Sequence, residues 1–304
     1  MSGHRWYRAF GLLIRSDITI PEYRSAKPGT PDITIGSSDA AREARQDIER
    51  QGIDVRGAHL LEDGMLLHVE RVGDFIIRNG SEIELSPLPD AEMNFLRLYL
   101  VGSVMGTLFH QRGQFIFHGA AILAQDQVSV FVGDSGTGKS TLISHLTLAG
   151  YPALADDTLP VLEDTDGFLA WPGAQVFKMW EDAIQSIGKS AEGLTQVSQR
   201  YGKYFLENPC SAPDRATPVA EVFVLQHGPG FSIEPLGGLQ AIAALNEHTY
   251  RREFIGFLGQ DERYFAQLSR LVEKLRFYRF VRPNDASRLP EAIAALEKHW
   301  TTAD

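Results

Sequence analysis

The chain has 304 residues, of which 43% are hydrophobic and 22% are charged, which is ordinary for a soluble globular protein with room for two domains. Its formal net charge of −10 argues against bulk nucleic-acid binding and against a basic membrane-binding surface. The single cysteine, Cys210, excludes an intramolecular disulfide and suits a reducing, cytoplasmic environment.

Residues 1–88 are predicted to form a small α+β domain. They contain short stretches of alternating apolar residues, a polar helix, and an Asn79-Gly80 pair that is typical of a hairpin turn. We recognise no catalytic constellation within residues 1–88. The predicted strands cover residues 6–14, 32–35, 65–69, 74–77 and 82–85, and the predicted helix covers residues 40–51.

A long helix is predicted over residues 91–111, because Leu98, Val101, Met105 and Leu108 recur at helical spacing. This apolar stripe indicates core packing rather than a ligand site, and it is too short to span a bilayer. Further along the chain we expect strands over residues 115–123, 151–155, 158–162, 168–171, 220–225 and 277–281, helices over residues 239–245, 262–275 and 289–298, and a helix with long active-site loops over residues 174–217.

A stretch of eight residues fits the phosphate-binding motif G-x-x-x-x-G-K-[ST], with Gly133, Gly138, Lys139 and Ser140 at its fixed positions. By chance, roughly one chain in a hundred of this length would match the bare pattern. The surrounding sequence removes most of that risk, because a β-type apolar run over residues 128–132 precedes the motif and a helical pattern follows it.

This motif, the P-loop, predicts a nucleoside triphosphate site. Its glycines allow backbone N–H groups to converge on a phosphate, and the following helix adds its positive N-terminal end. Lys139 is expected to reach the β- and γ-phosphates, and the Ser140 hydroxyl is expected to bind Mg²⁺. We therefore expect ATP and Mg²⁺ to bind at the consecutive residues Gly133, Asp134, Ser135, Gly136, Thr137, Gly138, Lys139, Ser140 and Thr141.

Two acidic residues, Asp156 and Asp157, are predicted to end the short strand that follows the P-loop helix. In P-loop proteins this is a place for a magnesium-linked or water-orienting carboxylate. Successive side chains of a regular strand point to opposite faces, so only one of the two is expected to face the γ-phosphate unless the strand bends. The alternative is a pair of solvated turn acids.

Three segments together resemble the catalytic core of bacterial HPr kinase/phosphorylase: His118-Gly119, the motif from Gly133 to Ser140, and Ala155-Asp156-Asp157. That family phosphorylates a protein serine from ATP and shares its P-loop fold with phosphoenolpyruvate carboxykinase. The resemblance covers residues 113–165. It implies an α/β catalytic domain of this type over residues 89–304, preceded by the α+β domain of residues 1–88.

The same resemblance implies roles for individual residues. Asp156 matches the family's general acid/base, and Asp157 matches its essential neighbour, which we expect to hold Mg²⁺ together with Ser140. Lys139 and His118 match catalytic residues near the transferred phosphate. For His118, a buried structural histidine is the alternative.

The sequence also departs from that family. Thr141 stands where the family usually has a glutamate, and the Gly-rich signature with an Arg-Gly pair is missing downstream of the aspartates. The reverse, phosphorolytic activity and recognition of the HPr protein are therefore not implied. The whole chain is more similar to divergent HPr-kinase-like proteins, some of which accompany lasso-peptide gene clusters and phosphorylate the precursor peptide near its C-terminus.

The expected function is an ATP-dependent transfer of the γ-phosphate to a hydroxyl, by resemblance a serine, of a peptide or protein. A small-molecule hydroxyl kinase and a nucleotide-gated binding protein stay open as alternatives. Residues 1–88 are expected to help dock the acceptor, and homo-oligomerisation stays open. Among the basic residues that could stabilise the phosphoryl group, Lys178, Arg200, Lys203, Arg251 and Arg252, we favour Arg200 and Lys203.

Overall fold

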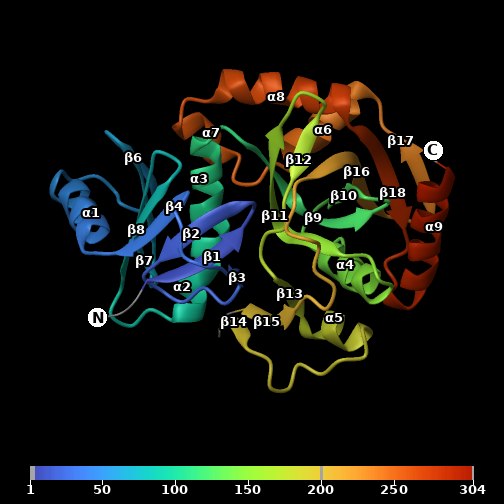
Figure 1. The fold of residues 1–304 in the computed structure, drawn as a ribbon, viewed down its shortest axis with the longest axis horizontal. Coiled ribbons are helices and arrows are strands. Elements are labelled where there is room, and N and C mark those ends of the chain that lie inside the picture. Colours follow the sequence, from blue (N-terminus) through green and yellow to red (C-terminus); the bar gives the residue numbers. More distant parts are fainter. Residues whose placement is uncertain (1–3, 199–200, 303–304) are drawn as a thin grey trace. The chain divides into compact units, whose positions relative to one another are not determined.

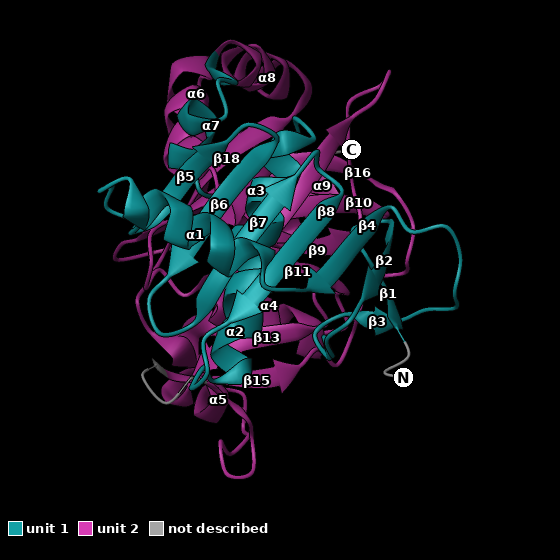
Figure 2. Cartoon of the chain, turned by 90° about the vertical axis from the view of Figure 1, so that its left-hand side faces the viewer, with its two compact units in different colours: residues 1–114, 251–261 teal, residues 115–250, 262–304 magenta. Residues whose placement is uncertain are grey.

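The computed structural model describes residues 4–198 and 201–302, and the chain divides into two compact units (Figure 2). Unit 1 comprises residues 1–114 and 251–261, and unit 2 comprises residues 115–250 and 262–304. The boundary therefore lies later than the one expected at residues 88 and 89. The helical segment in between packs within unit 1, where the ring of Phe109 lies 4.9 Å from that of Phe10.

Unit 1 is built on a mixed eight-stranded sheet (Figure 1). Its elements are β1 (Arg5–Ala9), β2 (Leu12–Ser16), β3 (Arg24–Ser25), β4 (Ile33–Ser37), α1 (Ala40–Arg50), β5 (Gly57–Leu61), β6 (Gly64–Val69), β7 (Gly73–Arg78), β8 (Glu82–Pro87), α2 (Met93–Tyr99), a π-helical turn (Leu100–Val104), α3 (Met105–Gln111) and α7 (Glu253–Phe257). The strand order is β3-β1-β2-β4-β8-β7-β6-β5. Helix α1 covers one face, where Ala41, Leu66 and Ile76 form a small buried cluster.

Most predicted elements of this unit are confirmed, and two differ. The single strand expected over residues 6–14 is a hairpin, because Phe10 and Gly11 both take positive φ values, 56° and 74°, and turn the chain back on itself. The long helix expected over residues 91–111 is interrupted by the π-helical turn, whose residues are all buried. The predicted hairpin at Asn79-Gly80 is present between β7 and β8.

Unit 2 contains the P-loop and a seven-stranded sheet. Its elements are β9 (Phe115–Ala124), β10 (Gln127–Val132), α4 (Lys139–Leu148), β11 (Ala153–Glu163), β12 (Phe168–Ala170), β13 (Val176–Trp180), α5 (Glu181–Ser186), β14 (Gln196–Ser198), β15 (Tyr201–Glu207), β16 (Thr217–His227), β17 (Ser232–Pro235), α6 (Gly238–Glu247), α8 (Asp261–Lys274), β18 (Arg276–Arg282), a 3₁₀ turn (Ala286–Arg288) and α9 (Leu289–Thr302). The mixed α/β class is as predicted.

The arrangement of the strands fixes where the site lies. The order is β10-β9-β11-β12-β16-β18-β17, and β10 also pairs with β16. Strands β10, β16 and β18 are parallel, so their carboxyl ends meet at one edge of the sheet. Such an edge is where ligands bind in open α/β sheets. The P-loop follows β10 at this edge, and the buried ring of Phe131 stacks on Phe223 beneath it.

Two predictions for this unit differ from the structure. The strand expected to end at Asp157 continues to Glu163, so both acids lie inside β11 rather than at its end. The region 174–217, expected to be a helix with long loops, forms α5 and a three-stranded sheet of order β13-β15-β14. Phe177 and Met179 alternate with exposed or half-buried neighbours on β13, which is the pattern of a one-sided strand.

No helix in the described ranges, residues 4–198 and 201–302, has both the length and the apolar character needed to cross a bilayer.

Candidate active site

The P-loop joins β10 to α4 with a backbone that requires glycine. Gly136 and Gly138 take φ values of 89° and 79°, in the left-handed region that other residues rarely adopt. At Gly138 a Cβ atom would also collide with the guanidinium of Arg282. Because Gly138 directly precedes the first helical residue, Lys139, the free N–H groups of α4 begin at the loop.

Two basic side chains hold the carbonyl groups of this loop. Lys139 Nζ donates to the carbonyl oxygens of Gly133 and Asp134, at 2.6 and 3.1 Å. Arg282 Nη2, from the end of β18, donates to the carbonyl oxygen of Thr137 at 2.6 Å. Burial lowers the pKa of Lys139, although Asp157 and Asp156 oppose that effect. These contacts fix the backbone of the loop from both ends.

Asp156 lies beside the P-loop serine with part of its hydrogen-bonding capacity unused. Its Oδ2 accepts a hydrogen bond from the backbone N–H of Lys178 at 2.9 Å. Its Oδ1 is buried and has no hydrogen-bond partner of normal geometry in the described part of the chain. Burial raises the pKa of Asp156 to about 6, against the lowering effect of the Ser140 hydroxyl and the Lys178 amide. A carboxyl group in this state can exchange a proton near neutral pH.

Asp157 forms an ion pair with Lys178. Lys178 Nζ donates to Asp157 Oδ2 at 2.7 Å, while Asp157 Oδ1 lies 3.6 Å from His118 Nε2. Burial acts to raise the pKa of Asp157, but Lys178 and His118 outweigh it and lower that pKa overall. Burial likewise acts to lower the pKa of Lys178, but Asp157 outweighs it and the pKa is raised. The pair is therefore charged, and the pKa of Asp157 is shifted in the opposite direction to that of the neighbouring Asp156.

His118 lies on β9, and its backbone N–H donates to the carbonyl oxygen of His248 at 2.8 Å. Its side chain is 49% exposed, so the alternative of a buried structural histidine does not describe it. The ring lies 5.4 Å from that of Tyr250. The imidazole therefore lies at the surface of the site, next to the Asp157 carboxylate.

The structure brings Lys139, Ser140, Asp156, Asp157 and His118 together at one edge of the sheet. Both acids interact electrostatically with Lys139, and both contact Lys178, Asp156 through the backbone N–H and Asp157 through Nζ. Lys178 was only one of several basic candidates in the sequence, yet it is the residue that links the two acids. The apolar residues Phe177 and Met179 on either side of Lys178 alternate as in a strand, and this pattern could have indicated the strand that carries Lys178.

The other basic residues predicted from the sequence do not all lie at this cluster. Lys203 lies on β15 and interacts electrostatically with Lys139 and Asp157, but its ammonium group sits 5.1 Å from the centre of the Trp180 ring. Arg200 lies outside the described residues. Arg251 and Arg252 belong to unit 1. Arg282 was not predicted as a site residue, although it directly follows the strand expected over residues 277–281.

Comparisons with known proteins add little to this geometry. No protein-family model matches the sequence, and no curated protein matches it. Among solved structures, the chain is similar to the Hpr(Ser) kinase/phosphatase from Coxiella burnetii, with 11% sequence identity and a TM-score of 0.34, over 62% of this chain and 97% of that chain. A similarity this distant does not define the type of fold or the activity, and the chemistry of the site has to be argued from its own residues.

Those residues suit a magnesium-bound nucleoside triphosphate. The left-handed glycines leave a backbone cradle without side chains, and no atom lies within 4 Å of a Cβ built at Gly136. The buried, unsatisfied Oδ1 of Asp156 is the kind of atom that a ligand normally satisfies. Hydroxyl and carboxylate oxygens, here from Ser140 and Asp157, are the donors that Mg²⁺ prefers.

Proposed function

We propose that the protein is an ATP-dependent phosphotransferase that transfers the γ-phosphate to a hydroxyl group of a peptide or protein. The observation that carries the proposal is the buried carboxyl group of Asp156, with a pKa of about 6, next to Ser140 of the P-loop. A kinase needs a base within reach of the acceptor hydroxyl and on the far side of the γ-phosphate. A nucleotide switch that hydrolyses ATP would instead use such a group to orient water, so transfer to an acceptor is what distinguishes the two functions.

In this proposal the residues of the cluster have separate roles in binding the phosphates and magnesium. Lys139 and the N–H groups at the start of α4 hold the phosphates, and Arg282 keeps the loop in shape through Thr137. Ser140 and Asp157 would hold Mg²⁺, which neutralises phosphate charge when it is bound. Asp157 Oδ2 is occupied by Lys178, so its Oδ1 is the atom left for that role.

Asp156 supplies the proton chemistry. Its ionised carboxylate accepts the proton of the acceptor hydroxyl while the acceptor oxygen forms its bond to the γ-phosphorus. The bond between that phosphorus and the oxygen bridging to the β-phosphate breaks, and ADP leaves. With a pKa of about 6, the carboxyl group is ionised in most molecules at pH 7 and is still a stronger base than an ordinary aspartate.

The type of acceptor is proposed from the resemblance to a known family and not from the geometry of the site. The resemblance of the P-loop and the aspartate pair to HPr-kinase-like proteins favours a serine hydroxyl, and the divergent members favour a ribosomally made precursor peptide. Acceptor docking by residues 1–88 stays a prediction. Because unit 1 continues through residue 114, a truncation near Asp90 would remove its sheet from the helices that pack with it, so surface substitutions are the better test.

The experiment is intact-mass analysis of candidate peptides after incubation with the full-length protein and Mg·ATP. We expect one phosphate to be added to a serine of an accepted peptide, and none when Lys139→Ala replaces the wild-type protein. If no peptide, protein or small-molecule hydroxyl gains phosphate while ATP changes the affinity for a partner, the nucleotide-gated binding protein is the correct reading.

A further inference from the structure

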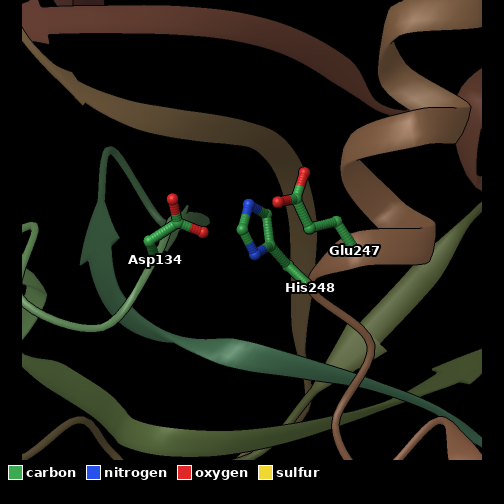
Figure 3. Close-up of side chains that lie close together, drawn as sticks. All are labelled: Asp134, Glu247 and His248. Atoms are coloured by element: carbon green, nitrogen blue, oxygen red, sulfur yellow. The ribbon is translucent and has the colours of Figure 1, made fainter.

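Unit 2 contains a second cluster of polar side chains, and the P-loop residue Asp134 is one of its members. One donor atom from each of Asp134, Glu247 and His248 lies within 4.8 Å of the other two. Asp134 follows β10, Glu247 is the last residue of α6, and His248 comes next in the chain. Figure 3 shows the imidazole ring between the two carboxylates.

His248 is the buried member of the cluster. Only 7% of the residue is exposed, and within residues 4–198 and 201–302 its ring makes no hydrogen bond. Its backbone is held on both sides, since its N–H donates to Ala244 and its carbonyl accepts from His118 at 2.8 Å. Imidazole is the commonest metal ligand in proteins, and a ring held in place without a hydrogen-bond partner is available for that role. Its fixed position facing two carboxylates therefore indicates a missing ligand.

The charges of the cluster point to a cation. Asp134 and Glu247 are exposed acids, and in the described residues neither carboxylate has a hydrogen-bond or ion-pair partner. A phosphate-binding loop attracts anions, so the carboxylate of Asp134 works against that attraction, although Lys139 of the same loop interacts with it electrostatically. A bound divalent cation removes this conflict and satisfies the histidine nitrogen at the same time.

We propose that Asp134, Glu247 and His248 form a binding site for a divalent transition-metal ion of the Zn²⁺ or Mn²⁺ class. One imidazole nitrogen and two carboxylate oxygens suit such ions, whereas Mg²⁺ prefers oxygen ligands alone. The site is separate from the oxygen ligands proposed for magnesium, and it stands whether or not the protein transfers phosphate.

The three donor atoms have to move closer together to bind a common ion. Ligands at ~2.1 Å from a common ion lie about 3–4 Å apart, so the donor atoms have to approach by roughly 1 Å. The exposed side chains of Asp134 and Glu247 can move, while His248 is fixed. Three protein ligands leave at least one coordination position for water or a phosphate oxygen. Because Asp134 is part of the P-loop, metal binding would also restrain that loop.

The test uses the full-length protein, stripped of metal with a chelator and free of nucleotide. Zn²⁺ affinity is measured by competition with a chromophoric chelator, with and without an excess of Mg²⁺. Co²⁺ absorption spectra report the ligand set independently. We expect one Zn²⁺ per chain, held against excess Mg²⁺, and at least tenfold weaker binding in Asp134→Asn and in Glu247→Gln. Both substitutions keep shape at exposed positions, so they are not expected to disturb folding.

His248→Asn should abolish high-affinity binding, with thermal melting used to verify that the buried site still folds. The matched controls are His227→Asn and Glu234→Gln, which change exposed residues of β16 and β17 outside the cluster. Both should bind Zn²⁺ as the wild type does. The proposal is overturned if the wild type takes up no stoichiometric Zn²⁺, if Asp134→Asn and Glu247→Gln bind it normally, or if His227→Asn removes it.

Discussion

Each unit buries an aspartate beside basic side chains, but the two aspartates use their oxygens differently. In unit 1, Asp74 is fully buried and both oxygens are engaged, Oδ1 with His68 Nδ1 at 2.6 Å and Oδ2 with Arg45 Nε at 3.1 Å. In unit 2, Asp156 has one oxygen bonded to a backbone N–H and the other buried without a partner of normal geometry in the described chain.

This difference separates a structural carboxylate from a chemical one. Both oxygens of Asp74 are hydrogen-bonded within the fold. Replacing Asp74 should therefore change the free energy of unfolding but not the rate of transfer. The acid in unit 2 keeps an unfavourable, partly unsatisfied environment that raises its pKa, and it does so beside a phosphate-binding loop. An unfavourable environment of this kind, next to a phosphate-binding loop, is expected where a ligand completes the site.

The largest expected effect is that of Asp156→Asn. Removing a general base of this type typically lowers the rate of the chemical step by roughly 10²–10⁴-fold. Nucleotide affinity should stay within a few-fold, because Lys139 and the loop amides remain. The measurement is single-turnover phosphotransfer beside a titration of Mg·ATP binding, and normal transfer by the variant would remove Asp156 from the mechanism. Asp157→Asn is the companion variant and should weaken Mg·ATP binding as well.

Asp156→Asn is expected to lower the rate of transfer but not to lower the stability of the folded protein. The folded-state pKa of Asp156 is raised from 3.8 to about 6, so the folded protein binds the proton more tightly than the unfolded chain. This contribution favours folding at low pH and is lost as the pH rises through 6. Asp156→Asn should therefore be at least as stable as the wild type at pH 8, as measured by urea denaturation.

The next largest effect is expected for Lys139→Ala. Its ammonium group is the preorganised charge at the mouth of the P-loop, and the loss of one such contact lowers the rate by roughly 10²–10³-fold. The substitution also frees the carbonyl oxygens of Gly133 and Asp134, so circular dichroism and melting should accompany the kinetics. A folded variant with wild-type transfer would contradict the assignment of the P-loop.

The sequence was sufficient for the parts of the site that lie close together along the chain. The P-loop was predictable because eight adjacent residues carry the motif and its strand and helix flank it. Lys178 was not singled out, because its contact with Asp157 depends on a three-stranded sheet made of short strands with weak patterns. The extent of β11 was missed because aspartates are disfavoured in strands, and here their contacts with Lys178 and the pairing of β11 with β9 offset that preference.

The cluster of Asp134, Glu247 and His248 shows the same limit more clearly. Nothing local to Glu247-His248 distinguishes it from the polar end of an ordinary helix. It meets Asp134 only because β9 and the segment after α6 are joined by backbone hydrogen bonds, from His118 to His248 and from Tyr250 to Ile116. Contacts of this kind follow from tertiary structure, which a residue pattern does not encode locally.

A smaller, graded effect is expected from pH. Transfer requires the ionised form of Asp156, so the single-turnover rate should be level above about pH 7 and fall about tenfold per unit below pH 6. The residual rate of Asp156→Asn should not show this dependence between pH 5 and pH 8. A wild-type profile that breaks near pH 4 would mean that the carboxyl group has the acidity of an ordinary aspartate and is not tuned as a base.

The smallest effect on transfer, none, is expected for Asp74→Asn, which completes the comparison. The substitution keeps the shape of the side chain but takes the negative charge from between Arg45 and His68. Leaving a buried charged group without its partner should cost about 1–3 kcal/mol of unfolding free energy. Urea denaturation would measure this loss, and single-turnover transfer below the melting temperature should match the wild type. If Asp74→Asn instead lowers transfer in the folded protein, the carboxylate of unit 1 is not merely structural. If Asp156→Asn destabilises the protein as much as Asp74→Asn, the unsatisfied oxygen of Asp156 is not the strained group described above.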